Sequence, residues 1–305
     1  MSAKQRGVAI VLAMGVVALA AMAATAVMIT QSTWSRESEL TAGHVQAQAL
    51  IQAGVDWSRA VLGNDLRSNS VIHLGEPWAL RLPPMPVEGG ELAGYMEDQQ
   101  GRFNLNNLVK GGKVNLEQLA NFRRLLSVLG LPTALAGAVV DWIDADSEPQ
   151  PQGGAEDETY LAMQPPYLAA NRPLIDVAEL ALVRGFDDGV RARLRPFVTA
   201  LPRFTAVNAN TASPEVLAAV VEGLGLDGAR AVVAQRERAY FRNWDEFFRQ
   251  LPPGLIVPTE NISVSSDYFM ATLRVTIGGV QARGVVLLAR GNTGGWPAIV
   301  WRKMP

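Results

Sequence analysis

The chain has 305 residues, enough for one large or two modest domains that each bury a hydrophobic core without disulfides. Its 27 basic and 29 acidic residues give a net charge of -2, which argues against a general binder of polyanions. The sequence has no cysteine, which excludes disulfides, thiolate metal sites and cysteine nucleophiles, and only His44 and His73 are available as imidazole bases.

The first predicted element is a membrane-spanning helix. No charged residue occurs between Arg6 and Arg36, and residues 8–30 are almost entirely apolar, which is long enough to cross a bilayer. The alternative interpretation is a cleaved secretory signal peptide, but the apolar region of such a peptide is shorter than residues 8–30. Because Lys4 and Arg6 precede the segment, the positive-inside rule places the N-terminus in the cytoplasm and the soluble part of the chain in the periplasm.

The helix is predicted to continue beyond the membrane. Residues 31–62 carry apolar side chains among alanine and polar residues and contain no proline. At about 1.5 Å per residue, a helix over residues 8–62 reaches roughly 80 Å, half in lipid and half in water. A rod of this kind suits a subunit of a filament.

The rest of the stretch 31–110 is predicted to contain the first strands of a sheet. The proline-rich residues 82–86 are interpreted as a turn region, and two or three strands are expected between Trp78 and Met96. The asparagines that follow Asp98 are interpreted as structural, because amide side chains favour turns and helix caps.

Residues 111–255 are predicted to form a mostly α-helical domain. Helical periodicity covers residues 116–129, 134–143, 177–183, 190–197, 214–221, 229–238 and 244–251. Within this domain, residues 183–194 and 221–232 both follow the order helix, glycine turn, helix.

The second of these copies looks like a helix-hairpin-helix module of DNA-binding proteins. A DNA-uptake or DNA-binding membrane protein is therefore the alternative function. However, Thr211 or Ser213 can cap the helix that Pro214 opens, and this capping role explains the segment without any contact to DNA. Asp227 stands at the hairpin tip, where a phosphate binder needs lysine, so we favour a structural hairpin without nucleic-acid contact.

The clearest chemical signal is an acidic loop. Seven carboxylates lie between Asp141 and Glu158, and residues 125–171 contain no lysine or arginine. Packing these charges together is repulsive without a cation, and a hard divalent ion is the natural partner of carboxylate oxygens. The spacing is not that of an EF-hand. A solvated acidic loop that binds no ion is the other interpretation.

Residues 256–305 are predicted to complete the sheet. Residues 269–290 have a period of two around Gly278-Gly279, which predicts a β-hairpin, and a last strand is expected over residues 298–302. The predicted fold class is α+β: a long N-terminal helix packed on an antiparallel β-sheet, with a large all-α domain inserted between the sheet halves. Common catalytic motifs are absent from the sequence, so no enzyme is predicted.

Three segments give the chain a resemblance to a known family. The start, Lys4-Gln-Arg-Gly-Val-Ala-Ile-Val-Leu, resembles the leader of type IV pilins and pseudopilins. Residues 98–106 resemble an Asp-x-x-Gly-Arg-x-Asn-Leu-Asn segment, and residues 141–160 resemble Asp-Trp-Ile-Asp-x-Asp followed by Gly-Ala-Glu-Asp-x-x-Tyr. Both are typical of the K-type minor pseudopilin of type II secretion, the GspK family. The fifth residue after Gly7 is Leu12 instead of the usual pilin glutamate, a departure that is also typical of the K type.

The resemblance implies how the protein is processed and where it acts. Residues 1–7 would be a prepilin leader that a prepilin peptidase removes between Gly7 and Val8, and residues 8–30 would anchor the protein in the inner membrane. The subunit would initiate and cap the pseudopilus at its tip during protein export, together with other minor pseudopilins of the I and J type.

The resemblance also implies that the acidic loop holds calcium, as one or two ions. Among the carboxylates, we expect Asp144, Asp146, Glu156 and Asp157 to be the ligands. The aromatic and aliphatic residues beside them would pack inward and fix the loop ends: Trp142, Ile143 and Tyr160.

Overall fold

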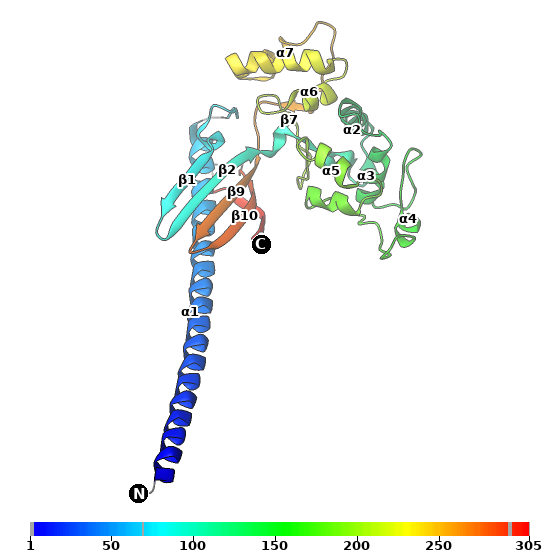
Figure 1. Ribbon diagram of the computed structural model, residues 1–305. Helices are drawn as coiled ribbons and strands as arrows, with labels where there is room; N and C mark the ends of the chain where they lie inside the picture. The colour runs from blue at the N-terminus through cyan, green and yellow to red at the C-terminus, as the bar shows by residue number, and fades with distance from the viewer. Residues whose placement is uncertain (1–2, 69, 292–294, 305) are drawn as a thin grey trace.

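The computed structural model describes residues 3–68, 70–291 and 295–304, and the side chains of residues 3–9 and 65–68 lie outside that description. Figure 1 shows a long helical rod, a sheet packed on the end of the rod away from the N-terminus, and a group of short helices beyond the sheet. This arrangement confirms the predicted α+β fold with a helical insertion.

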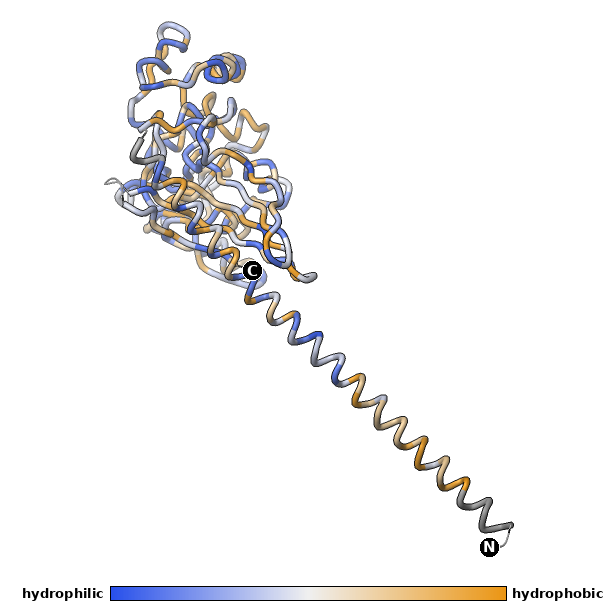
Figure 2. Tube along the Cα trace, turned by 90° about the vertical axis from the view of Figure 1, so that its left-hand side faces the viewer, coloured by the Kyte–Doolittle hydropathy of each residue, from blue (hydrophilic) through white to orange (hydrophobic). Residues whose placement is uncertain are grey.

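Helix α1 is one unbroken helix over Ala3–Ser68. Its 66 residues correspond to roughly 100 Å at about 1.5 Å per residue. Every residue from Ile10 to Ala42 is exposed, and Figure 2 shows apolar residues along the half of the rod nearer the N-terminus. This part of α1 is long and apolar enough to cross a membrane. The predicted leader cleavage between Gly7 and Val8 stays a prediction, and Met1 and Ser2 of the leader lie outside the described residues.

The C-terminal part of α1 packs on the sheet through a stripe of small and apolar residues. The buried positions recur every three or four residues, as expected for one face of a helix: Gly43, Ala47, Ile51, Gly54, Val55, Ser58 and Leu62. The contact is close, since a Cβ atom added at Gly284 of the sheet would lie 2.5 Å from Cγ2 of Ile51. A glycine at this position therefore lets the helix and the sheet approach each other.

The main sheet has five antiparallel strands in the order β1-β2-β9-β10-β11. Its strands are β1 (Leu82–Val87), β2 (Gly90–Asp98), β9 (Tyr268–Ile277), β10 (Val280–Ala289) and β11 (Ala298–Lys303). The predicted hairpin turn is confirmed: Gly278 and Gly279 join β9 to β10 with φ values of 51° and 85°, which glycine adopts without strain.

One prediction for the sheet was wrong. Residues 82–86 are not a turn region but part of strand β1. This strand lies at the edge of the sheet, where residues that lack a backbone N–H are tolerated because one side of the strand has no partner. Local composition alone does not reveal that position.

The chain between β2 and β9 forms the insertion. Its helices are α2 (Leu116–Val128), α3 (Leu135–Ile143), α4 (Asp157–Leu161), α5 (Asp188–Leu194), α6 (Pro214–Val220), α7 (Gly225–Arg238) and α8 (Trp244–Phe248), with a 3-10 helix, η4, over Val177–Leu182. Each predicted helical segment overlaps one of these. The sequence did not indicate α4, whose five residues are too few to show a helical period.

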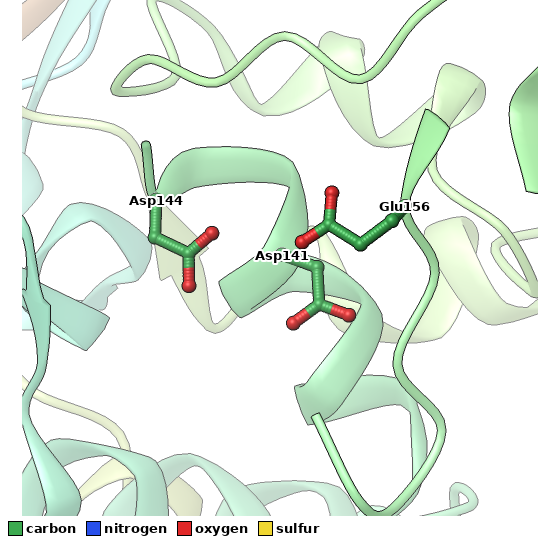
Figure 3. A group of neighbouring side chains, drawn as sticks. All are labelled: Asp141, Asp144 and Glu156. Carbon is green, nitrogen blue, oxygen red and sulfur yellow. The ribbon is translucent and has the colours of Figure 1, made fainter. Parts of the chain in front are cut away.

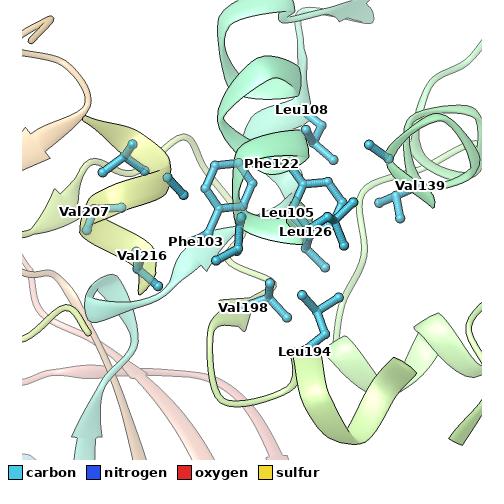
Figure 4. Packing of buried hydrophobic residues seen from close by; sticks show 14 of the residues in the cluster. Phe103, Leu105, Leu108, Phe122, Leu126, Val139, Leu194, Val198, Val207 and Val216 are labelled. Carbon is cyan, nitrogen blue, oxygen red and sulfur yellow. The ribbon is translucent and has the colours of Figure 1, made fainter. Parts of the chain in front are cut away.

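The insertion has a hydrophobic core of its own, which runs in sequence from Phe103 to Ile262 (Figure 4). Short strand pairs support it: β3 (Phe103–Asn104) with β6 (Val198–Thr199), β7 (Val207–Asn208) with β8 (Ile262–Ser263), and the hairpin β4 (Val109–Lys110) with β5 (Lys113–Val114). Three more 3-10 helices lie near these strands: η2 (Gln99–Gly101) lies between β2 and β3, η3 (Leu105–Leu108) lies between β3 and β4, and η1 (Pro77–Ala79) precedes β1.

The asparagines after Asp98 are structural, as the sequence indicated. Asn106 is buried, and its Nδ2 donates to the carbonyl oxygens of Leu174 and Leu201, each at 2.9 Å. Its Oδ1 accepts from the backbone N of Leu174 at 2.8 Å, and Oδ1 of Asn104 accepts from the backbone N of Leu201 at 3.0 Å. These amide groups satisfy the backbone of segments that form no regular structure.

Candidate metal centre

Three carboxylates of the acidic loop meet inside the insertion (Figure 3). Asp141 lies on the last turn of α3, Asp144 caps the end of that helix, and Glu156 immediately precedes α4. One oxygen of each carboxylate lies within 4.8 Å of the others, and the three residues are 0%, 1% and 7% exposed. The loop therefore folds back to bring Glu156 beside the end of α3.

Asp141 also holds the loop in this conformation. Its Oδ2 accepts hydrogen bonds from the backbone N of Ala155 at 2.6 Å and of Gln150 at 3.1 Å. A Cβ atom added at Gly154 would lie 2.5 Å from the same oxygen, so the close approach of the backbone requires glycine. A carboxylate on α3 thus binds both sides of the return turn.

Aromatic packing fixes the two ends of the loop, as expected from the sequence. Trp142, Ile143 and Tyr160 are all buried. The rings of Trp142 and Tyr160 meet edge to face with centroids 5.1 Å apart, a favourable geometry for aromatic pairs. The end of α3 and the start of α4 are therefore held together by a buried aromatic contact beside the carboxylates.

The other two carboxylates, Asp144 and Glu156, have no hydrogen-bond donor among the residues that the structure describes. Both oxygens of Asp144 and both of Glu156 are buried, and they accept no hydrogen bond from any described residue. Burial, together with the nearby charges of Asp146 and Asp141, raises the pKa of Asp144 to about 6. Burial and the neighbouring acidic residues raise the pKa of Glu156 to about 7, and burial also raises the pKa of Asp141.

These observations fit a hard divalent cation. Buried carboxylates without donors or basic neighbours are costly unless they are protonated or coordinate a metal. Calcium takes oxygen ligands at about 2.3–2.6 Å, so one ion is able to contact three oxygens that lie within 4.8 Å of one another. The donor set, which consists of oxygen atoms alone, is the kind that calcium and magnesium prefer.

The structure brings together two of the four expected ligands, Asp144 and Glu156. Asp146 is exposed, and its Oδ1 accepts from the backbone N of Glu148 at 2.9 Å. Asp157 is half-buried, and its Oδ1 accepts from the backbone N of Ala169 at 2.9 Å. Asp141 was not expected among the ligands. The spacing of three residues between Asp141 and Asp144 could have indicated it as a ligand, because positions i and i+3 share one face of a helix.

The hairpin that resembles a DNA-binding module packs as a structural element. Ser213 caps α6 by accepting a hydrogen bond from the backbone N of Val216 at 3.3 Å. The residues of α6 from Val216 to Val220 are buried. At the start of α7, Asp227 forms an ion pair with Arg230 at 3.0 Å, which places a carboxylate where a phosphate would bind.

Comparisons with known proteins identify the family that the chain is similar to. Two family models, both described as type II secretion system (T2SS), protein K, match residues 101–203 and 207–265. The type II secretion system protein K of Pseudomonas aeruginosa is 39% identical over 303 residues, which cover 95% of this chain and 90% of that protein. The protein K of Aeromonas hydrophila is 33% identical over 288 residues, which cover 84% of each.

A solved structure has the same fold. A chain in the crystal structure of the GspK-GspI-GspJ complex from the enterotoxigenic Escherichia coli type 2 secretion system matches with a TM-score of 0.77 and 26% identity. The match covers 88% of this chain and 99% of that chain. A protruding apolar helix, a sheet packed on it and a helical insertion define a minor pseudopilin. The chain belongs to the type II secretion system protein K family. The DNA-binding alternative has no support from these comparisons.

Proposed function

We propose that this minor pseudopilin is the tip subunit that initiates and caps the pseudopilus during export of folded proteins across the outer membrane. The observation that carries the proposal is the place of the insertion, at the end of the molecule opposite the N-terminus of α1 (Figure 1). In a filament whose subunits bundle through parallel α1 helices, the insertion would extend above the sheet and would leave no room for a further subunit on top of it.

Leu12 supports the same position. It is 64% exposed on the apolar part of α1, where pilins carry a glutamate that pairs with the N-terminus of a neighbouring subunit. A charged side chain in lipid is costly without a partner, so a subunit with no neighbour above it is better served by leucine. Leucine at this position therefore fits a subunit at the tip.

The remaining parts of the proposal concern assembly. We propose that α1 anchors the protein in the inner membrane, with its sheet and insertion in the periplasm, after a prepilin peptidase has cut between Gly7 and Val8. Minor pseudopilins of the I and J type are the proposed partners, by analogy with the GspK-GspI-GspJ complex. The proposed role is structural, without enzymatic activity and without nucleic-acid binding.

We also propose that the acidic centre binds calcium. Asp141, Asp144 and Glu156 would hold the ion, and the nearby Asp146 and Asp157 would complete its shell or hold a second ion. When bound, calcium supplies the positive charge that neutralises the buried carboxylates. Since these side chains come from the end of α3 and the start of α4, binding would join the two ends of the loop and stabilise the insertion.

The tip position is testable by labelling the insertion. Gly111 and Gly112 form the turn between β4 and β5, and a Cβ atom added at either meets no other atom within 4 Å, so an epitope tag fits there. Tagged and untagged chains would be expressed in a bacterium that lacks its own protein K and overproduces the major pseudopilin. We expect both chains to restore secretion and the label to occur at one end of each filament. Labels along the filament would contradict the tip position.

A further inference from the structure

A cleft of about 540 Å³ lies between the main sheet and the base of the insertion, and it shares no residue with the acidic centre. Its floor is the face of the sheet that turns away from α1, because Ala271 and Leu273 pack in the core beneath α1 while the alternate residues Met270 and Thr272 line the cleft. The opposite wall comes from η4 and the segment between α5 and β6. The volume is typical of ligand sites.

The cleft carries an excess of positive charge. It is lined by four basic residues and two acidic ones. The two acidic residues are already engaged: Glu97 pairs with Arg102 at 3.3 Å, and Asp176 pairs with Lys303 at 2.8 Å. The other two basic residues, Arg195 and Arg283, are exposed and have no acidic partner within the residues that the structure describes.

Arg283 has a second basic neighbour. Arg274 of β9 is its direct partner in the register between β9 and β10, so the two guanidinium groups lie on the same face of the sheet. Like charges at opposed positions of neighbouring strands are destabilising. An anion bound over this face would relieve the repulsion.

The two edges of the sheet differ in a way that indicates the kind of occupant. Strand β1 carries Pro83, Pro84 and Pro86, which lack the N–H groups that an added strand needs. Strand β11 contains no proline, and in the described part of the chain no strand pairs with its outer side. Trp301 and Lys303 of this open strand line the cleft, and the buried indole N–H of Trp301 donates to no described group. Open backbone groups beside apolar and basic side chains suit a polypeptide better than a small anion.

We propose that the cleft binds an extended acidic segment of another polypeptide. Its carboxylates would lie over Arg195 and Arg283, and its backbone would run beside β11. Charge-assisted hydrogen bonds from guanidinium groups to carboxylates supply the affinity, and the apolar floor accepts the side chains between the acidic ones. The proposal does not depend on the position of the subunit in a filament.

The test uses the full-length chain in an uncharged detergent at constant calcium concentration. The probe is a fluorescein-labelled peptide of alternating aspartate and valine with blocked ends, and binding is followed by fluorescence anisotropy. A peptide with asparagine in place of aspartate should bind much more weakly. We expect Arg195→Gln and Arg283→Gln each to raise the Kd of the acidic peptide about three- to ten-fold, with a larger loss in the double variant.

Arg238→Gln is the matched control, because Arg238 is also exposed but lies on α7 and outside the cleft. It should change the Kd less than about two-fold, as expected for a distant, screened charge. Thermal midpoints should agree among all variants, since the substituted side chains are exposed. Equal binding of the asparagine peptide, an unchanged Kd in the double variant, or an equal loss in Arg238→Gln would overturn the proposal. Displacement of the peptide by an equal concentration of glycerol phosphate would assign the cleft to a phosphate group instead.

Discussion

Removal of the cation should destabilise the insertion, and substitution of the carboxylates should abolish that effect. Asp144 and Glu156 bury four oxygens without a described donor, and an unsatisfied buried group costs about 1–3 kcal/mol, so we expect the ion-free loop to be less stable than the ion-bound one. Calcium at 100 times its Kd would add about 2.7 kcal/mol to the free energy of unfolding. For a domain spanning residues 101–265, this corresponds to a rise in Tm of roughly 5–10 °C.

The assay compares the wild type with an Asp144→Asn, Glu156→Gln double variant by scanning calorimetry, with calcium and after its removal. Both proteins are full-length chains in an uncharged detergent. The double variant keeps the shapes of both side chains but removes their charges, so calcium should not shift its Tm. Without calcium it should unfold at or above the Tm of the wild type, because the repulsion is gone.

Glu158→Gln serves as the control, since Glu158 is an exposed carboxylate of the same loop. It should keep the full calcium response. Equal calcium shifts in the wild type and the double variant would refute the assignment of the ion to this cluster. If the wild type shows neither a shift nor calcium binding in titration calorimetry, the segment is a solvated acidic loop, and the family assignment is unaffected.

Three further predictions concern pH, buried amides and helix packing. In calcium-free protein the free energy of unfolding should fall as the pH rises from about 4 to about 7, because folding raises the pKa of Asp144 to about 6 and of Glu156 to about 7. Urea titrations at several pH values measure this fall. In saturating calcium the fall should disappear, since the ion binds the ionised groups. Asn106→Ala leaves three backbone groups unpaired and should cost about 2–4 kcal/mol in urea unfolding; a cost near zero would mean that water replaces the amide. Gly284→Val should cost about 1–3 kcal/mol by the same assay because its side chain meets α1, whereas Gly291→Ala, where an added Cβ meets no atom of the described residues within 4 Å, should be neutral.

The elements that the sequence predicted correctly are those that local patterns determine. The unbroken apolar and amphipathic spacing over residues 8–62 predicts one helix whatever it packs against, and the pair Gly278-Gly279 favours a tight turn by itself. The proline-rich strand β1 was misread because its stability comes from its place at the edge of the sheet, which depends on pairing with β2. Short helix α4 was missed because five residues do not establish a period.

The candidate site shows the same division. The density of acidic residues without neighbouring basic ones located the loop, and Asp144 and Glu156 were among the expected ligands. Sequence spacing did not reveal which carboxylates turn inward, because Asp146 and Asp157 lie one or two positions away and make backbone contacts instead. Asp141 belongs to a buried helix, and an acidic residue in an apolar stretch is a stronger signal of a site than one in an exposed run.

The junction between the insertion and the sheet depends on one buried carboxylate. Asp98 ends β2, and its oxygens accept hydrogen bonds from the backbone N of Gln100 and from the side chains of Asn208, Thr211 and Ser266. Gln100 belongs to η2, Asn208 and Thr211 lie in or just after β7, and Ser266 lies just before β9. One side chain therefore contacts both places where the chain passes between the sheet and the insertion. Close-packed interiors transmit strain, and a push along α1 would therefore reach the insertion without passing through a flexible linker. In the proposed tip position, this rigid connection would hold the cap in place above a growing filament, and calcium in the proposed acidic centre would extend the same rigidity to the loop between α3 and α4.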